Sequence, residues 1–162
     1  MGSTQYVHNG GTASGTVVNS DGWQIVKNGG VAGNTTVNQK GRLQVDAGGT
    51  ATNVTLKQGG ALVTSTAATV TGINRLGAFS VVEGKADNVV LENGGRLDVL
   101  TGHTATNTRV DDGGTLDVRN GGTATTVSMG NGGVLLADSG AAVSGAGATE
   151  RHSVSEAVRR MP

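Results

Sequence analysis

The chain repeats one phrase at a fixed interval. Gly-Gly-Arg-Leu-Asp-Val at 94–99 returns as Gly-Gly-Thr-Leu-Asp-Val at 113–118, nineteen positions later. A fixed period of about 20 residues is the signature of a solenoid, in which each unit buries its apolar face only by stacking on its neighbours. The repeat therefore predicts a coil of stacked units and not a globular fold.

The nineteen-residue period divides most of the chain into repeated units. Two neighbouring units are shortened, and residues 1–15 fit as the last part of a further unit, so we expect about seven and a half coils. The units are 16–34, 35–53, 54–70, 71–88, 89–107, 108–126 and 127–145.

Each unit contains three short segments with β-type alternation. In the second segment Leu43 and Val45 point one way while Arg42 and Gln44 point the other. The third segment is Thr-Ala-Thr, as at 50–52. The first segment has one recurring apolar position, which we expect to face inward: Val18, Val37, Leu56, Ile73, Leu91, Val110 and Met129. The pattern predicts an all-β, parallel β-helix with three short strands per coil.

Glycine and asparagine mark the corners. Glycine reaches positive φ without a Cβ penalty, and asparagine is among the next best residues there. Asparagine recurs at the third corner, as Asn34, Asn53, Asn88 and Asn107. Gly-Gly pairs stand at 48–49, 59–60, 94–95, 113–114, 121–122 and 132–133.

Composition agrees with this fold and excludes several functions. There are 29 glycines, and the aromatic residues are only Tyr6, Trp23 and Phe79, so the core must be a stack of aliphatic side chains. Twelve basic and twelve acidic residues balance, which argues against a nucleic-acid partner. No cysteine is present, and no apolar run is long enough for a membrane-spanning helix. The first residues lack a signal-peptide pattern.

The last residues break the repeat. We expect residues 1–145 to form the β-helix and residues 146–162 to be a non-repeat tail, either a short helix or disordered. Val154, Ala157, Val158 and Met161 have helical spacing, but an isolated helix of this length is marginal.

Phrases such as TTVNQKGRLQVDAGGTATN and NGGTATTVSMGNGG resemble the passenger repeats of self-associating bacterial autotransporter adhesins, the family of antigen 43 and of the adhesin involved in diffuse adherence. The resemblance covers residues 4 to about 145. It implies a right-handed parallel β-helix that is displayed outside the outer membrane of Gram-negative cells, and that promotes cell aggregation and biofilm formation. The implied partners are identical rods on neighbouring cells, together with host surface glycans or proteins. Insertion of this segment into a membrane is not expected.

Family members carry a signal peptide before the repeats and a translocator barrel after them. Neither pattern is found in these 162 residues. We therefore expect a truncated or frame-shifted piece of a passenger.

Asp98 and Asp117 invite an enzymatic interpretation, because equivalent positions on stacked coils lie about 5 Å apart, as in a retaining glycosidase. A polysaccharide-processing β-helix enzyme is the alternative function. However, Arg96 and Arg119 lie on the same face, and the short corners leave no long loops to build a cleft. We expect a solvated charge ladder, no catalytic residues and no enzyme.

No cofactor or metal site is expected either. His8, His103 and His152 show no ligand spacing, and the calcium-binding nonapeptide of β-rolls does not occur.

A row of Thr-x-Thr segments suggests a third class, the ice-binding solenoid. We call this row the Thr-x-Thr ladder; it comprises Thr50 and Thr52, Thr104 and Thr106, and Thr123 and Thr125. Regularity is what such a face needs, and it is interrupted by Val31 and Gly33 in one unit and by Lys85 and Asp87 in another. Threonine is also common in strands for structural reasons.

The candidate surface for self-association is a row of polar residues beside the first glycine corner of each unit. Repeated at fixed spacing on a rigid rod, such groups can form many weak hydrogen bonds together. We call this row the polar ladder; it comprises Asn19, Asp21, Asn38, Gln39, Lys57, Gln58, Glu92, Asn93, Asp111, Asp112 and Asn131.

Overall fold

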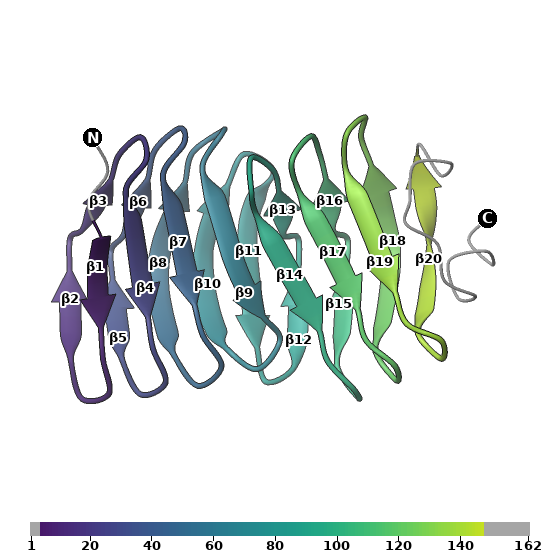
Figure 1. Cartoon of the computed structure of the whole chain (residues 1–162), viewed down its shortest axis with the longest axis horizontal. Helices are drawn as coiled ribbons and strands as arrows, with labels where there is room; N and C mark the ends of the chain where they lie inside the picture. Colours follow the sequence, from purple (N-terminus) through teal and green to yellow (C-terminus); the bar gives the residue numbers. More distant parts are fainter. Residues whose placement is uncertain (1–3, 148–162) are drawn as a thin grey trace.

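The structure is a computed structural model that describes residues 4–147, with side chains to residue 145. This part of the chain is an all-β parallel solenoid of about seven coils (Figure 1). Strands one coil apart pair in parallel and mostly nineteen residues apart, as in Leu97 with Leu116. The fold class predicted from the repeat is therefore confirmed.

One long face is a seven-stranded parallel sheet, which we call the first sheet. It is built from the second segment of each coil. Its strands are β1 (Thr4–Val7), β4 (Trp23–Val26), β7 (Arg42–Val45), β9 (Ala61–Ser65), β14 (Arg96–Val99), β17 (Thr115–Val118) and β19 (Val134–Ala137).

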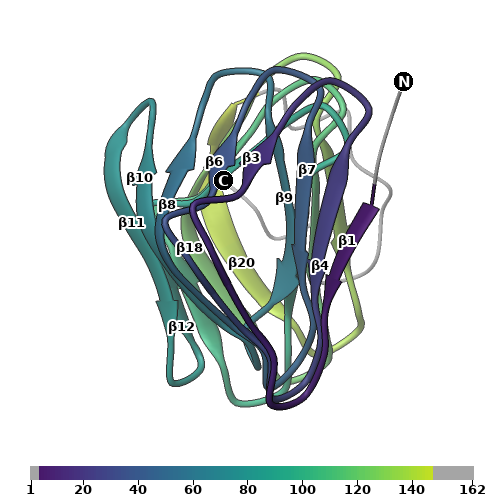
Figure 2. The same cartoon turned by 90° about the vertical axis from the view of Figure 1, so that its left-hand side faces the viewer.

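The opposite long face, which we call the second sheet, is built mainly from the third segments. Seen from the N-terminal end, the two faces converge at one corner, and short strands lie across the third side (Figure 2). The strands of the second sheet are β2 (Thr12–Ser14), β5 (Val31–Gly33), β8 (Thr50–Leu56), β10 (Thr69–Asn74), β11 (Gly77–Val82), β12 (Lys85–Asp87), β15 (Thr104–Thr106), β18 (Thr123–Met129) and β20 (Ala142–Gly147). The short strands are β3 (Val17–Val18), β6 (Thr36–Val37), β13 (Val90–Leu91) and β16 (Arg109–Val110).

The core is a set of aliphatic columns running along the rod. Full burial of one leucine contributes roughly 1.5–3 kcal/mol. The main column consists of Leu43, Leu62, Leu97, Leu116 and Leu135, all 0% exposed, and it is offset between β9 and β14, where Leu97 lies beside Thr64. At its N-terminal end the same position is Gln24, also 0% exposed, which donates to Gln5 Oε1 (2.6 Å) and accepts from the Thr35 hydroxyl (2.8 Å). The polar group is thus tolerated because both of its ends are hydrogen-bonded.

The corners have the backbone conformation that the sequence predicted. The first glycine of each predicted Gly-Gly pair has a positive φ, such as Gly48 at 82° and Gly113 at 83°. The third-corner asparagines Asn34, Asn53 and Asn107 lie at 57°, 56° and 61°. These values confirm that Gly and Asn were correctly assigned to corners.

The prediction for 71–88 was wrong. We expected a shortened coil with Ile73 facing inward, but β10, β11 and β12 form two antiparallel hairpins within the second sheet, and Ile73 is 54% exposed. The β11–β12 turn has positive φ at both central residues, Glu83 (51°) and Gly84 (79°), as a two-residue type I′ hairpin requires. In Figure 2 the β10–β11 hairpin projects beyond the outline of the other coils.

The insertion also shifts the first sheet. Strand β9, before the insertion, pairs directly with β14, after it. In this pairing Arg96 lies beside Val63, which is 33 residues earlier in the chain. In the preceding step Arg42 lies beside Ala61. Because Ala61 and Arg96 each follow a Gly-Gly corner, regular stacking would pair them with each other. The register has therefore slipped by two residues, and this slip is what shapes the surface described below.

Strand β20 extends to Gly147. The rest of the predicted tail lies outside the described residues.

Candidate functional site

The polar ladder lies where each coil turns from a short strand into the first sheet. A tight turn closes each of these corners, for example through the Gly41 N–H donating to the Asn38 carbonyl (2.9 Å). Corners of successive coils are also bonded, as in Lys40 N–H to the Gly59 carbonyl (2.9 Å). The fold therefore brings the predicted residues onto one edge of the rod, on both sides of the hairpin insertion.

Several members of the ladder are used within the rod itself. Asn38 Nδ2 donates to Asn19 Oδ1 (2.8 Å). Across the register slip, Glu92 Oε2 accepts from Gly59 N–H (2.9 Å), while Asn93 Nδ2 donates to the Gly59 carbonyl (3.0 Å). These groups hold neighbouring coils together and have less capacity left for a partner.

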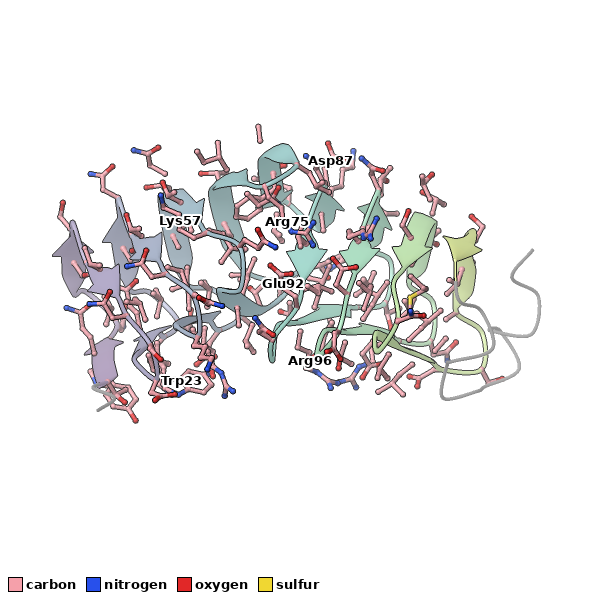
Figure 3. The ribbon with its side chains drawn as sticks, turned by 90° about the horizontal axis from the view of Figure 1, so that it is seen from above. Trp23, Lys57, Arg75, Asp87, Glu92 and Arg96 are labelled. Carbon is pink, nitrogen blue, oxygen red and sulfur yellow. The ribbon has the colours of Figure 1, made fainter. Side chains whose placement is uncertain are left out.

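The tip of the inserted hairpin crosses the ladder. Arg75 bonds to Glu92 Oε1 (3.2 Å) and also to Asp111, which accepts in addition from Arg109 Nε (2.9 Å). Partial burial opposes the charged form of Arg75, but the hydrogen bond to Asp111 and the two carboxylate charges raise its pKa. Figure 3 shows Arg75 and Glu92 close together on this edge. The arginine ties the insertion to two coils beyond it.

The remaining members are the ones available to a partner. Their side chains are exposed, and within residues 4–147 they make no side-chain hydrogen bond or ion pair. They are Asp21, Gln39, Lys57, Gln58, Asp112 and Asn131.

Asp98 and Asp117 are side by side in register on β14 and β17, as the repeat predicted. Both are held by arginines: Arg96 Nε donates to Asp98 (2.9 Å) and Arg96 Nη2 to Asp117 (2.5 Å), while Arg119 lies 3.5 Å from each carboxylate. The group is a network of two carboxylates and two guanidinium cations whose charges balance.

One detail of that prediction was wrong. We expected both aspartates to face water, but Asp117 is only 8% exposed. Burial raises its pKa and the nearby Asp98 charge adds to this, although Arg119 and Arg96 act in the opposite direction. The two arginines lie against the carboxylate and take the place of solvent.

The Thr-x-Thr ladder is in register between β15 and β18, where Thr104 pairs with Thr123 and Thr106 with Thr125. It is not continuous along the second sheet. Strand β10 continues the threonines of β8, since Thr69 pairs with Thr50, but β11 and β12 then interrupt the array, and on β12 Lys85 lies beside Thr104. The regular array that an ice-binding face needs is therefore missing from the described part of this sheet.

Sequence reasoning missed a cleft near the N-terminal end of the first sheet. Its volume is about 340 Å³, and it is lined by Asp21, Trp23, Lys40, Arg42 and Asn93. Two signals could have indicated it: Trp23 is the only tryptophan, and the first two corners carry Asp-Gly and Lys-Gly where later corners carry Gly-Gly.

Among residues 4–147 no cluster of three or more His, Asp or Glu side chains is arranged to hold a metal ion. The same residues include no helix with the length and apolarity needed to cross a membrane.

Fold and surface together define a repeat protein that presents a stacked outer surface on a rigid rod. Its sequence matches a family model described as the adhesin of bacterial autotransporter system, probable stalk, over residues 10–60 and 71–133. Since these segments make up more than half of the chain, it belongs to this family of autotransporter adhesins. The predicted resemblance is thereby confirmed.

A solved structure is also similar: the crystal structure of the hyper-glycosylated fragment 55–350 of TibA, glycosylated by TibC. Sequence identity is 25%, and the match covers 95% of this chain and 72% of that one, with a TM-score of 0.39. At this TM-score the likeness is too weak to support inferences about the site.

Proposed function

We propose that this segment is a surface-displayed adhesin stalk that associates with identical rods on neighbouring cells, and so promotes aggregation and biofilm formation. The family is one of adhesins. The observation that carries the proposal is the set of unengaged, exposed polar side chains that recur along one edge of a rigid rod. Many weak contacts at fixed spacing act together when two rods align, so none of them needs to be strong.

Charge supports an antiparallel alignment. The available part of the ladder carries Asp21 and Lys57 on the N-terminal side of the hairpin insertion and Asp112 on its C-terminal side. In a two-fold arrangement each residue meets its complement twice, Lys57 of one rod facing Asp112 of the other. Such a contact brings opposite charges together without any change in the rod.

Cell settling tests the proposal. The full chain is displayed between a signal peptide and a translocator barrel, and the settling rate is compared with cells that display the barrel alone. We expect faster settling with the chain, and a return to the barrel rate when Gln39, Lys57 and Gln58 are all changed to Ser.

The matched control carries the same number of changes on the second sheet, with Thr52, Thr106 and Asp87 changed to Ser. These residues are also exposed. Equal loss of settling in the control, or no loss in the ladder variant at equal surface display, would refute the role of the ladder.

A further inference from the structure

The cleft beside Trp23 is a consequence of the two-residue register slip. The slip carries the corner formed by residues 92–94 over the start of β9, where Glu92 and Asn93 form hydrogen bonds with the backbone of Gly59. A Cβ on Gly94 would lie only 3.2 Å from the Arg42 guanidinium, so this corner closes directly over Arg42. The cleft is thus a built feature of this one place in the solenoid and does not recur in each coil.

The backbone of the lining residues is unusual. Asp21 and Lys40 have φ of 66° and 67°, in the left-handed region that favours glycine. The four later corners of this kind in the described rod have glycine at the same position: Gly59, Gly94, Gly113 and Gly132. The two coils at the cleft therefore retain a charged side chain where the fold favours none. Strained residues of this kind gather at functional sites.

The residues that line the cleft offer cationic donors and oxygen acceptors that are not bonded to the rest of the described rod. Within residues 4–147 the side chains of Asp21, Lys40 and Arg42 make no hydrogen bond or ion pair with one another or with the rest of the rod. Asn93 uses its amide N–H₂ on the Gly59 carbonyl, which leaves Oδ1 as an acceptor. Two cations, one carboxylate and one amide oxygen therefore surround the cleft.

The aromatic ring fixes the arginine. The Arg42 guanidinium lies 4.9 Å from the centre of the Trp23 ring. A guanidinium stacked on an indole still presents its N–H groups in its own plane, ready to form paired hydrogen bonds with a carboxylate. The indole adds an apolar wall.

We infer that this cleft binds an acidic monosaccharide unit, a sugar ring that carries a carboxylate. Lys40 and Arg42 pair with the carboxylate, while Asp21 and Asn93 accept hydrogen bonds from the ring hydroxyls. A simple anion would leave Asp21 and Asn93 without hydrogen-bond donors, and a neutral sugar would leave two cations without a partner. A volume of about 340 Å³ is at the small end of ligand sites, which suits one ring better than a length of peptide.

This inference goes beyond the proposed self-association. Asp21 and Asn93 belong to both the cleft and the polar ladder, whereas Lys40 and Arg42 belong to the cleft alone, so the test relies on Lys40.

The test uses the emission of Trp23, the only tryptophan of the chain, in the purified full-length protein. Glucuronate is titrated, with glucose, acetate and a short Asp-containing peptide as comparison probes. We expect a saturable change with glucuronate at much lower concentration than with the other three. The change Lys40→Gly should weaken glucuronate binding about tenfold, as expected for loss of one charge-assisted hydrogen bond.

Two further variants complete the test. Asp21→Asn keeps the corner but removes the carboxylate, and it should reduce the preference for glucuronate over acetate. Lys57→Ala removes the same charge as Lys40→Gly from the next corner, outside the cleft, and it should leave the titration unchanged. The same Lys57 change should slow cell settling while Lys40→Gly should not, so failure of one proposal is distinguishable from failure of the other.

The inference is overturned if glucuronate gives no saturable change, or if acetate, glucose or the peptide matches it. It is equally overturned if Lys57→Ala weakens binding as much as Lys40→Gly does.

Discussion

Replacing Lys40 with glycine should make the protein more stable, although most substitutions destabilise. Lys40 has a φ of 67°, and a left-handed non-glycine residue costs roughly 1–2 kcal/mol. Glycine in turn loses more backbone freedom on folding, at about 0.5–1 kcal/mol. The Lys40 side chain makes no hydrogen bond or ion pair in the described part of the rod, so little else is lost. The expected net gain is on the order of 0.5–1 kcal/mol in the free energy of unfolding.

Urea unfolding followed by far-UV circular dichroism measures this gain as a higher midpoint at unchanged slope. The reverse change provides the control. Gly113 occupies the equivalent corner at φ 83°, and a Cβ there would lie 3.0 Å from the backbone nitrogen of Asn93. Gly113→Ala should therefore lower the midpoint. A lower midpoint for Lys40→Gly would refute the strain argument, and with it one of the supports for a functional cleft.

Three other substitutions test separate parts of the structure. Leu97→Ala removes a side chain that is 0% exposed in the main core column, and it should lower the free energy of unfolding by about 2–5 kcal/mol. Its control, Thr106→Ala on the exposed face, should change that free energy by no more than about 0.5 kcal/mol. The midpoints of urea unfolding measure both changes. Arg75→Ala should lower hydrogen-exchange protection in β10 and β11 with little change in the rest of the rod, because its ion pairs are partly exposed; equal loss along the whole rod would contradict this. The pKa of Asp117 is raised in the folded protein, so its contribution to stability is greatest below pH 3.8 and is lost as pH rises through the raised value. Relative to wild type, Asp117→Asn should therefore gain stability as pH rises across that window. A difference in unfolding free energy between the two proteins that does not change with pH would contradict the burial argument.

The coil architecture was readable from the sequence because the constraints repeat. Each coil must supply an inward aliphatic residue such as Leu97 or Leu116, and a residue that accepts positive φ at each corner. These requirements are local, so their nineteen-residue spacing reports the fold directly. Pairing of Leu97 with Leu116 and of Asp98 with Asp117 follows from the same spacing.

The hairpin insertion could not be read in the same way. Residues 71–88 have nearly the length of one unit and alternate in the same manner, so the period alone places Ile73 inside. What differs is the turn chemistry: Glu83-Gly84 is a two-residue hairpin turn, and it reverses the chain where a Gly-Gly corner would carry it forward. The burial of Phe79 (3% exposed) then makes the reversed strand part of the core.

The sequence predicted where the polar ladder lies, but not which of its side chains form hydrogen bonds within the rod. Spacing placed the polar ladder on one edge, whereas hydrogen bonds across the slip, such as those of Glu92 and Asn93, depend on a register that the sequence does not specify. The cleft beside Trp23 was missed for the same reason, because Asn93 reaches it only through the slip.

The most direct test of the proposed pairing is charge exchange between two populations of displaying cells. Cells with Lys57→Asp should not settle faster than barrel-only cells, since like charges then face each other, and cells with Asp112→Lys should behave the same way. Mixed in equal numbers, the two populations should settle together at close to the wild-type rate, because each altered residue again meets its opposite. If the mixture settles no faster than either population alone, while both chains are displayed at wild-type levels, antiparallel pairing through the polar ladder is wrong.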